Sequence, residues 1–302
     1  MSLFLAVLSN NILPAFMVMG AGVLLDRTIH VDKHTLSRMA LYLLTPCLVF
    51  SSITQATVDL ATFGQMALHM ALVTAAMIGI GLLVGRLLGW SERTTSALVL
   101  TIAFLNAGNL GLSVCLFTYG QAGLDLAIAS FVTSNLFCNT LGAYFAARGS
   151  QAGLKAVKRV LKMPAPYAFA LALLIRLLGW NVPSLLMNPI ELVGRASVPT
   201  MLLLLGIQIS QTRLRGRLGT VGIAVFIRLV IGAIVAFLLA PVAGLQGLAR
   251  QVAITEGSTP TAVVSGLMAI EFDADADLVS SVIFASTLLS SVTLTVLMLV
   301  LG

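Results

Sequence analysis

The stretch that decides the fold is Asn106-Ala107-Gly108-Asn109-Leu110-Gly111-Leu112-Ser113, in the middle of an uncharged hydrophobic segment from Thr95 to Thr118. A lipid-facing helix rarely holds two Asn and two Gly within six residues. A later hydrophobic segment, Gln251 to Ile270, is interrupted at the matching place by Glu256-Gly257-Ser258-Thr259-Pro260-Thr261. Paired interruptions in corresponding positions of two halves are typical of a binding site between membrane helices.

The composition places the chain in a membrane. Apolar residues make up 59% of its 302 residues and charged residues 9%, whereas soluble domains average roughly 45–50% and about 25%. A soluble protein of this length cannot bury that much apolar surface, so we expect an all-α polytopic membrane protein in contact with the lipid bilayer. A spanning helix needs about 20 mostly apolar residues. Ten segments qualify: 3–25, 36–55, 64–88, 95–118, 125–147, 164–180, 189–210, 218–240, 249–270 and 277–301.

Basic residues concentrate in the loops of one side. Loops after alternate segments hold thirteen Lys and Arg, five of them in the basic loop 148–163, against three on the other side. The positive-inside rule therefore predicts cytoplasmic basic loops, both termini outside, and a plasma membrane location, the inner membrane if the source is bacterial. These loops account for the net charge of +6, so no nucleic acid partner is expected. The three Cys lie in apolar segments without CxxC spacing, and no metal or other cofactor is expected.

The two halves of the chain repeat. Pro14 and Pro166 are 152 residues apart, and Gly108 and Pro260 are also 152 apart. Residues 1–147 and 164–302 are thus predicted to be two five-helix repeats. Because five is odd, the second repeat must be inverted relative to the first, a plan found in many secondary transporters.

The interruptions predict an anion site. Each leaves a half-helix N-terminus near the middle of the membrane, with free N–H groups and partial positive charge. Neutral side chains that hydrogen-bond lie beside them, and Pro260 prevents a continuous helix. The alternative is that Gly and Pro only kink the helices. The polar side chains in question are Asn106, Asn109, Ser258, Thr259 and Thr261.

Ionisable residues within spans are costly and are usually functional. Glu256 is interpreted as a proton or cation carrier for coupling, or as the partner of an arginine. Arg228 is expected to pair with Glu256 or to face a substrate carboxylate. His69 is expected near the outer face, and Gln208 is expected to bond between helices.

Enzyme signatures are missing from the chain, which has no GxxxxGK[ST], HExxH or GxSxG motif. We therefore expect a protein that is not an enzyme and does not itself use ATP.

Several stretches resemble the auxin efflux carrier family. The most specific are Ser258-Thr259-Pro260-Thr261-Ala262, Glu271-Phe272-Asp273-Ala274-Asp275-Ala276-Asp277 and Ser286-Thr287-Leu288-Leu289-Ser290. Leu44-Thr45-Pro46-Cys47-Leu48-Val49-Phe50-Ser51-Ser52 and Asn106-Ala107-Gly108-Asn109-Leu110-Gly111 also look like that family. The resemblance covers nearly the whole chain.

The resemblance implies two inverted five-helix repeats, similar to the folds of sodium/proton antiporters and bile acid transporters. It implies a scaffold of the first, second, sixth and seventh segments, a transport domain of the third to fifth and eighth to tenth, an elevator motion and a homodimer formed through the scaffold. Bacterial members are linked to malate, malonate and similar carboxylates, and the short loop 148–163 favours that type over plant PIN-type carriers. The resemblance also implies a crossover, the point where the two interrupted helices cross, as the substrate site. The residues that it places there are Asn106, Gly108, Asn109, Ser258, Thr259, Pro260 and Thr261, with Pro46 and Pro199 on the facing scaffold helices.

The leading hypothesis is a secondary carrier of small organic anions. One alternative is a sodium-coupled symporter of larger organic anions, with sodium ligands from Glu256, Thr261, Asn135, Thr133 and Ser134. Another is a membrane-embedded sensor, although no soluble output domain is present in the sequence. An intramembrane enzyme is disfavoured because no nucleophile–base or metal set appears.

Overall fold

The computed structural model describes residues 2–146, 163–212, 218–271 and 274–302. All elements in these ranges are helical. Most of the predicted basic loop 148–163, together with Arg213, Arg215 and Arg217, lies outside the described residues. In chain order the helices, with short π-helical turns labelled η, are α1 Ser2–Val7, η1 Leu8–Ile12, α2 Leu13–Thr28, α3 Lys33–Met39, η2 Ala40–Leu44, α4 Thr45–Gln55, α5 Leu60–Leu87, α6 Glu92–Ala103, η3 Ala107–Gly111, α7 Leu112–Phe137, η4 Cys138–Gly142, α8 Ala143–Ala146, α10 Pro164–Leu177, α11 Ser184–Arg195, α12 Ser197–Ser210, α13 Leu218–Phe226, η5 Ile227–Ile231, α14 Gly232–Leu239, α15 Gly247–Gly257, α16 Val264–Glu271 and α17 Ala276–Leu301.

Seven helices of the described chain are long and apolar enough to cross a membrane. The fold class is therefore that of a polytopic membrane protein. These candidate spans are Leu3–Thr28, Lys33–Gln55, Leu60–Leu87, Ala107–Ala146, Ser184–Ser210, Leu218–Leu239 and Ala276–Leu301.

The difference between seven observed spans and ten expected segments has local causes. The fourth and ninth expected segments are interrupted after α6 and α15. The sixth is α10, which has only 14 residues. The span Ala107–Ala146 covers parts of two expected segments, because the chain turns at Gly120 with a φ of 66° that favours glycine. The number of ten crossings stays a prediction.

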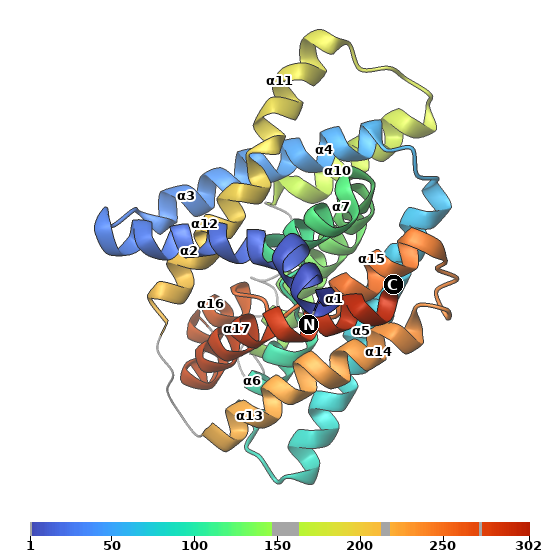
Figure 1. Ribbon diagram of the computed structural model, residues 1–302. Coiled ribbons are helices and arrows are strands. Elements are labelled where there is room, and N and C mark those ends of the chain that lie inside the picture. Colours follow the sequence, from blue (N-terminus) through green and yellow to red (C-terminus); the bar gives the residue numbers. More distant parts are fainter. Residues whose placement is uncertain (1, 147–162, 213–217, 272–273) are drawn as a thin grey trace.

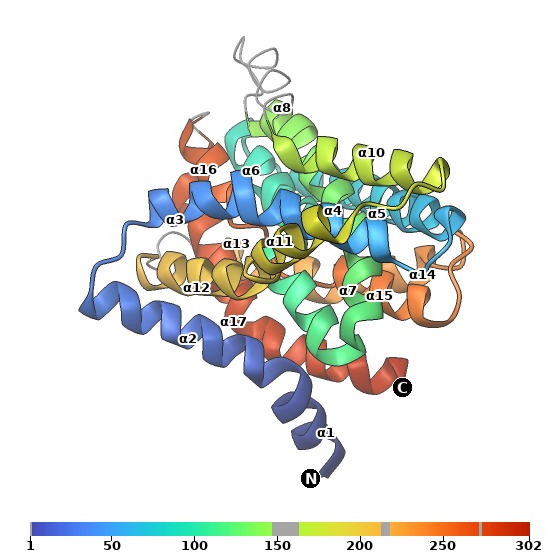
Figure 2. The same ribbon diagram turned by 90° about the horizontal axis from the view of Figure 1, so that it is seen from above.

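Close helix contacts depend on small residues. Helix α2 lies along α12 (Figures 1 and 2). A Cβ on Gly22 would overlap the backbone of Leu203, and one on Gly206 would overlap the backbone of Met19. Only glycine at these two positions lets the backbones approach so closely, as is common between membrane helices.

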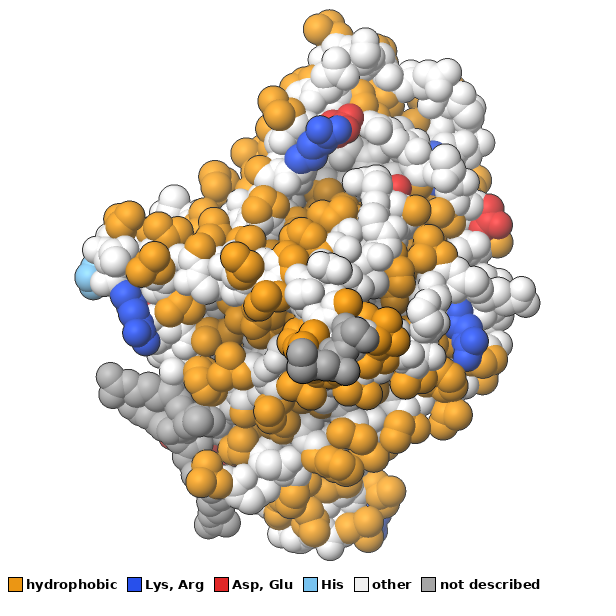
Figure 3. Space-filling view, viewed as in Figure 1, with side chains coloured by type: hydrophobic (Ala, Val, Ile, Leu, Met, Phe, Trp, Pro, Cys, Tyr) orange, Lys and Arg blue, Asp and Glu red, His pale blue; other side chains and the backbone are white. Residues whose placement is uncertain are grey.

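The remaining helices are arranged around the interrupted ones. Helix α4 packs against α10 and α11, while α5 packs against α6, α7, α14 and α15 (Figure 1). At the chain ends, the amide nitrogen of Asn11 lies 3.9 Å from the sulfur of Met298, so the first helical region lies against the C-terminal part of α17. The face seen in Figure 3 carries many apolar side chains with few charged groups between them, as contact with lipid requires.

Helix α5 begins at a cap at the edge of the apolar region. The backbone N–H of Thr62 donates to Oδ1 of Asp59 at 2.7 Å. Hydrogen bonds from the side chain and backbone of Thr62 lower the pKa of Asp59 below its ordinary value. The cap is thus ionised at neutral pH, where a negative charge suits a helix N-terminus.

Candidate functional site: the crossover cavity

The two interruptions cross and bond to each other. The backbone N–H of Asn106 donates to the carbonyl of Pro260 at 2.8 Å, and that of Ala262 donates to the carbonyl of Phe104 at 2.9 Å. Leu105 and Thr261 face each other in this short antiparallel pairing. Unpaired backbone groups are costly away from water, so each break supplies the hydrogen bonds that the other lacks.

The C-terminal end of α6 receives hydrogen bonds from the second half of the chain. The hydroxyl of Thr261 donates to the carbonyl of Thr101 at 2.7 Å, and the hydroxyl of Ser265 donates to that of Leu100 at 3.0 Å. These carbonyls belong to the last turn of α6, where an α-helix leaves its acceptors without internal partners.

Arg228 joins the ends of both interrupted helices. Its Nη1 donates to the carbonyl of Ile102 at 2.7 Å, and its Nη2 donates to the carbonyl of Gly257. The side chain is fully buried. A guanidinium is well placed there, because helix C-termini carry partial negative charge. The expected ion pair between Arg228 and Glu256 does not form in the described structure, since the guanidinium is used on these two carbonyls.

Glu256 lies one residue before that capped carbonyl and is also fully buried. The thiol of Cys115 lies 3.8 Å from its Oε1, and its Oε2 has no hydrogen-bond partner. On the other side is Gly111, where a Cβ would overlap the carboxyl group.

His69 corrects the expectation of an interfacial residue. It is fully buried, and its Nε2 lies 2.9 Å from the carbonyl oxygen of Ala236. Its ring faces Gly257. The position of His69 near the start of its hydrophobic segment suggested a place at the membrane surface. Its burial depends on which side of α5 packs against the protein, and the sequence position does not indicate that side.

A cavity of about 120 Å³ lies against the first interruption. It is lined by η3, α7 and η4 on one side and by α3, α12 and the start of α16 on the other. No Asp, Glu, Lys, Arg or His is among the described residues that line it. The polar lining consists of Ser37, Asn106, Asn109, Ser134, Asn135, Asn139 and Gln208.

Three amide groups of this lining have atoms without partners. These are Nδ2 of Asn106, Oδ1 of Asn139 and Oε1 of Gln208. Asn106 is only 5% exposed, and its Oδ1 already accepts from the backbone N–H of Asn109 at 3.2 Å. Because Oδ1 accepts that hydrogen bond, the orientation of the Asn106 amide is fixed, and Nδ2 is the donor that remains without a partner. Buried polar atoms are rarely left unpaired, so this donor points to a ligand or water in the cavity.

Both half-helix starts contribute to the same cavity. Helix η3 begins at Ala107 and α16 begins at Val264, and both residues line it. Since helix N-termini present free N–H groups and partial positive charge, their meeting favours an anion.

The predicted site residues separate into three groups. Asn106, Gly108 and Asn109 line the cavity. The hydroxyls of Ser258, Thr259 and Thr261 instead donate to carbonyls of Ile254, Glu256 and Thr101, and the carbonyl of Pro260 accepts from Asn106. Pro46 is partly buried in α4 and is not among the residues lining the cavity, while Pro199 lines a different one.

Sequence reasoning did not assign Ser37, Asn139 and Gln208 to the binding site. Their signal was a polar side chain in an apolar segment, which fits helix–helix bonding equally well. The proposed sodium ligands are divided between two places: Ser134 and Asn135 line the cavity, whereas Glu256 lies against Cys115 and Gly111.

A second cavity of about 210 Å³ shares Ser37, Gln208, Val263 and Leu267 with the first. Its far end is lined by Lys33 and His34 at the start of α3. The two cavities therefore adjoin each other at the four shared residues.

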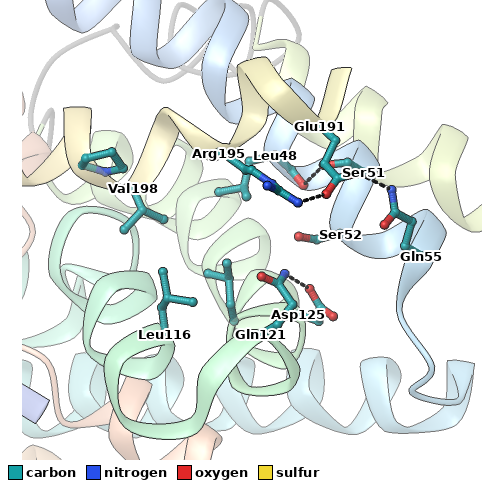
Figure 4. Close-up of a pocket in the computed structure, with 12 residues that line it drawn as sticks. Leu48, Ser51, Ser52, Gln55, Leu116, Gln121, Asp125, Glu191, Arg195 and Val198 are labelled. Atoms are coloured by element: carbon teal, nitrogen blue, oxygen red, sulfur yellow. Dashed lines mark hydrogen bonds and ion pairs between the residues drawn. The ribbon is translucent and has the colours of Figure 1, made fainter. Parts of the chain in front are cut away.

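The third cavity, of about 410 Å³, lies near the opposite ends of α4 and α12 (Figure 4). Its polar groups bond to one another. Arg195 pairs with Glu191 at 2.5 Å, Gln55 donates to Glu191 at 3.3 Å, and Gln121 donates to Asp125 at 2.8 Å. Because these groups already have partners, this cavity has weaker grounds as a ligand site than the crossover cavity.

Comparison with known proteins agrees with a membrane protein. The sequence profile of a family described as membrane transport protein matches residues 7–158 and 150–298. An uncharacterized transporter of Methanothermobacter thermautotrophicus is 31% identical over 87% of both chains. An uncharacterized transporter of Methanocaldococcus jannaschii is 26% identical over 66% of both chains. The chain belongs to the membrane transport protein family that includes the auxin efflux carriers.

Proposed function

We propose that this protein is a secondary carrier of small organic anions, and that the substrate carboxylate binds in the crossover cavity. The observation that carries the proposal is Nδ2 of Asn106, a buried donor without a partner beside two helix N-termini. A carboxylate accepts hydrogen bonds from such donors, and hydrogen bonds to charged groups contribute about 1.5–3 kcal/mol each.

The size of the cavity favours a small substrate. Drug-sized ligands occupy sites of about 300–1,000 Å³, whereas the crossover cavity measures about 120 Å³. A mono- or dicarboxylate of a few carbons matches that volume better than a bile-acid-sized anion. The described lining has no charged residue, so a bound anion would be held by neutral amides and helix N-termini. Without an ion pair to break, the anion can also be released.

The transport cycle in this proposal is an elevator. The helices carrying the breaks move with the substrate along a scaffold of α2, α3, α4, α10, α11 and α12, which forms a homodimer. The second cavity adjoins the crossover cavity at Ser37 and Gln208 and reaches Lys33, which the basic loops predict to be cytoplasmic, so it supports a conformation open toward the cytoplasm. The ammonium group of Lys33 in its lining would attract an anion.

A thermal-stability panel tests the proposal. Purified protein is heated with a series of mono- and dicarboxylates, with and without sodium. A ligand that binds only the folded state raises the free energy of unfolding, by about 2.7 kcal/mol when its concentration is 100 times its Kd. The melting temperature rises with it. Stabilisation by a small carboxylate regardless of sodium supports the anion carrier. Stabilisation only with sodium favours the sodium-coupled symporter, and no stabilisation by any carboxylate contradicts the proposal.

A transport assay distinguishes a carrier from a sensor, because a sensor binds the ligand without moving it across the membrane. The same carboxylate should exchange across the membrane of proteoliposomes that contain the protein. Stabilisation without exchange would favour the sensor.

A further inference from the structure

Glu256 is a buried ionisable group that substrate binding does not use. It is fully buried and does not line the crossover cavity. Its Oε1 has only the Cys115 thiol at 3.8 Å, and its Oε2 has no partner. Within the described ranges no Lys, Arg or His forms an ion pair with it. An isolated carboxylate in such surroundings is so costly that the group becomes neutral instead.

The groups around Glu256 do not offset a negative charge. Helices α5, α7, α14, α17 and η3 pack against α15. Helices α14 and η3 contain no ionisable side chain, and α17 has only Asp277, in its first turn. Asp125 of α7 lines the third cavity, and Arg86 is in the last turn of α5.

The remaining ionisable neighbours bond elsewhere. On α7, the hydroxyl of Tyr119 lies 3.0 Å from that of Thr255. On α5, His69 is bonded to the carbonyl of Ala236, and on η5, Arg228 is bonded to the carbonyls of Ile102 and Gly257. None of these groups contacts the carboxyl oxygens of Glu256.

We propose that Glu256 is a proton-binding site, protonated in this structure, and that its proton is the coupling ion. The carboxyl packs against Gly111 of the first break and lies one residue before Gly257, whose carbonyl Arg228 holds. An ionised Glu256 would put negative charge at the C-terminal end of α15, which is already partly negative. Proton binding therefore stabilises the packed crossover, and proton loss requires the two breaks to separate enough for water to reach Oε2.

Infrared spectroscopy of the purified protein tests the proton site directly. We expect a carbonyl-stretch band of a protonated carboxylic acid that persists at neutral pH and shifts in heavy water. Glu256→Gln should remove it, whereas the matched Glu191→Gln should keep it. If Glu256→Gln does not fold, Cys115→Ala should shift the band by removing the thiol beside Oε1. A protein without such a band, or with a band unaffected by these changes, contradicts the proposal.

Proteoliposomes test the coupling, which rests on the proposed function. A pH gradient should drive net carboxylate movement by the wild type. Glu256→Gln, which resembles the protonated form, should keep one-for-one carboxylate exchange but lose the response to the gradient. A Glu256→Gln carrier that still follows the gradient overturns the coupling. Failure of the wild type to bind any carboxylate instead overturns the proposed function and leaves the infrared result standing.

Discussion

The backbone N–H of Asn106 lies 2.8 Å from the carbonyl oxygen of Pro260, so residues 154 positions apart in the chain share a hydrogen bond where the two interrupted helices cross. This bond fixes the backbone of the same residue whose side chain presents a free donor to the cavity. The second interruption therefore contributes mainly by holding the first one in place.

The contact between Gly111 and Glu256 predicts a position-specific effect of added volume. Gly111→Ala should lower stability by about 1–3 kcal/mol, the usual cost of overpacking. Gly79→Ala should have little effect, because no atom lies within 4 Å of the added methyl group. Thermal unfolding of both variants measures the difference.

A second variant checks the cause of that effect. Glu256→Ala frees space beside Gly111, so combining it with Gly111→Ala should cost less than the sum of the two single changes. Strict additivity would show that the methyl group is accommodated somewhere else.

Gln208 offers a test that separates binding from stability. Its Oε1 is buried without a partner, and leaving a buried acceptor unpaired costs about 1–3 kcal/mol. Gln208→Leu removes this unpaired acceptor and should therefore keep or raise the melting temperature of the ligand-free protein. It also removes the side-chain N–H groups of a residue that lines the cavity, so it should weaken carboxylate binding. A variant that loses stability and binds normally would identify Gln208 as a packing residue.

Arg228 should prove sensitive to shape as well as charge. Arg228→Met leaves the carbonyls of Ile102 and Gly257 without this donor, and at about 1–3 kcal/mol for each buried acceptor the loss is about 2–6 kcal/mol. Arg228→Lys keeps a charge but lacks the two-pronged geometry, so its loss should be smaller. Melting temperatures rank the variants. Unchanged stability of Arg228→Met would mean that Arg228 does not hold the crossover together.

The sequence allowed prediction of the parts of the fold that depend on local pattern. Apolar runs indicated a polytopic helical membrane protein, and the polar interruptions around Gly108 and Pro260 indicated where two helices break. Side-chain partners could not be predicted in the same way, because they depend on helix rotation and packing. Arg228 was expected to pair with Glu256 or to face a substrate carboxylate, but it donates to the carbonyls at two helix ends. Thr261 was expected to face a substrate, but its hydroxyl donates to the carbonyl of Thr101. Asn139 and Gln208 reach the cavity only because α12 and η4 pack beside the first break.

The most direct test of the account is the affinity of purified protein for the best-stabilising carboxylate, measured by calorimetry for the wild type and Asn106→Asp. The substituted side chain keeps the oxygen that accepts from Asn109 but replaces the free donor by an oxygen. Loss of one hydrogen bond to a charged group, about 1.5–3 kcal/mol, corresponds to about 10- to 150-fold weaker binding. We predict at least that loss, with unchanged affinity for the matched Gln121→Glu in the third cavity. Wild-type affinity in a folded Asn106→Asp protein would contradict a carboxylate site at the crossover.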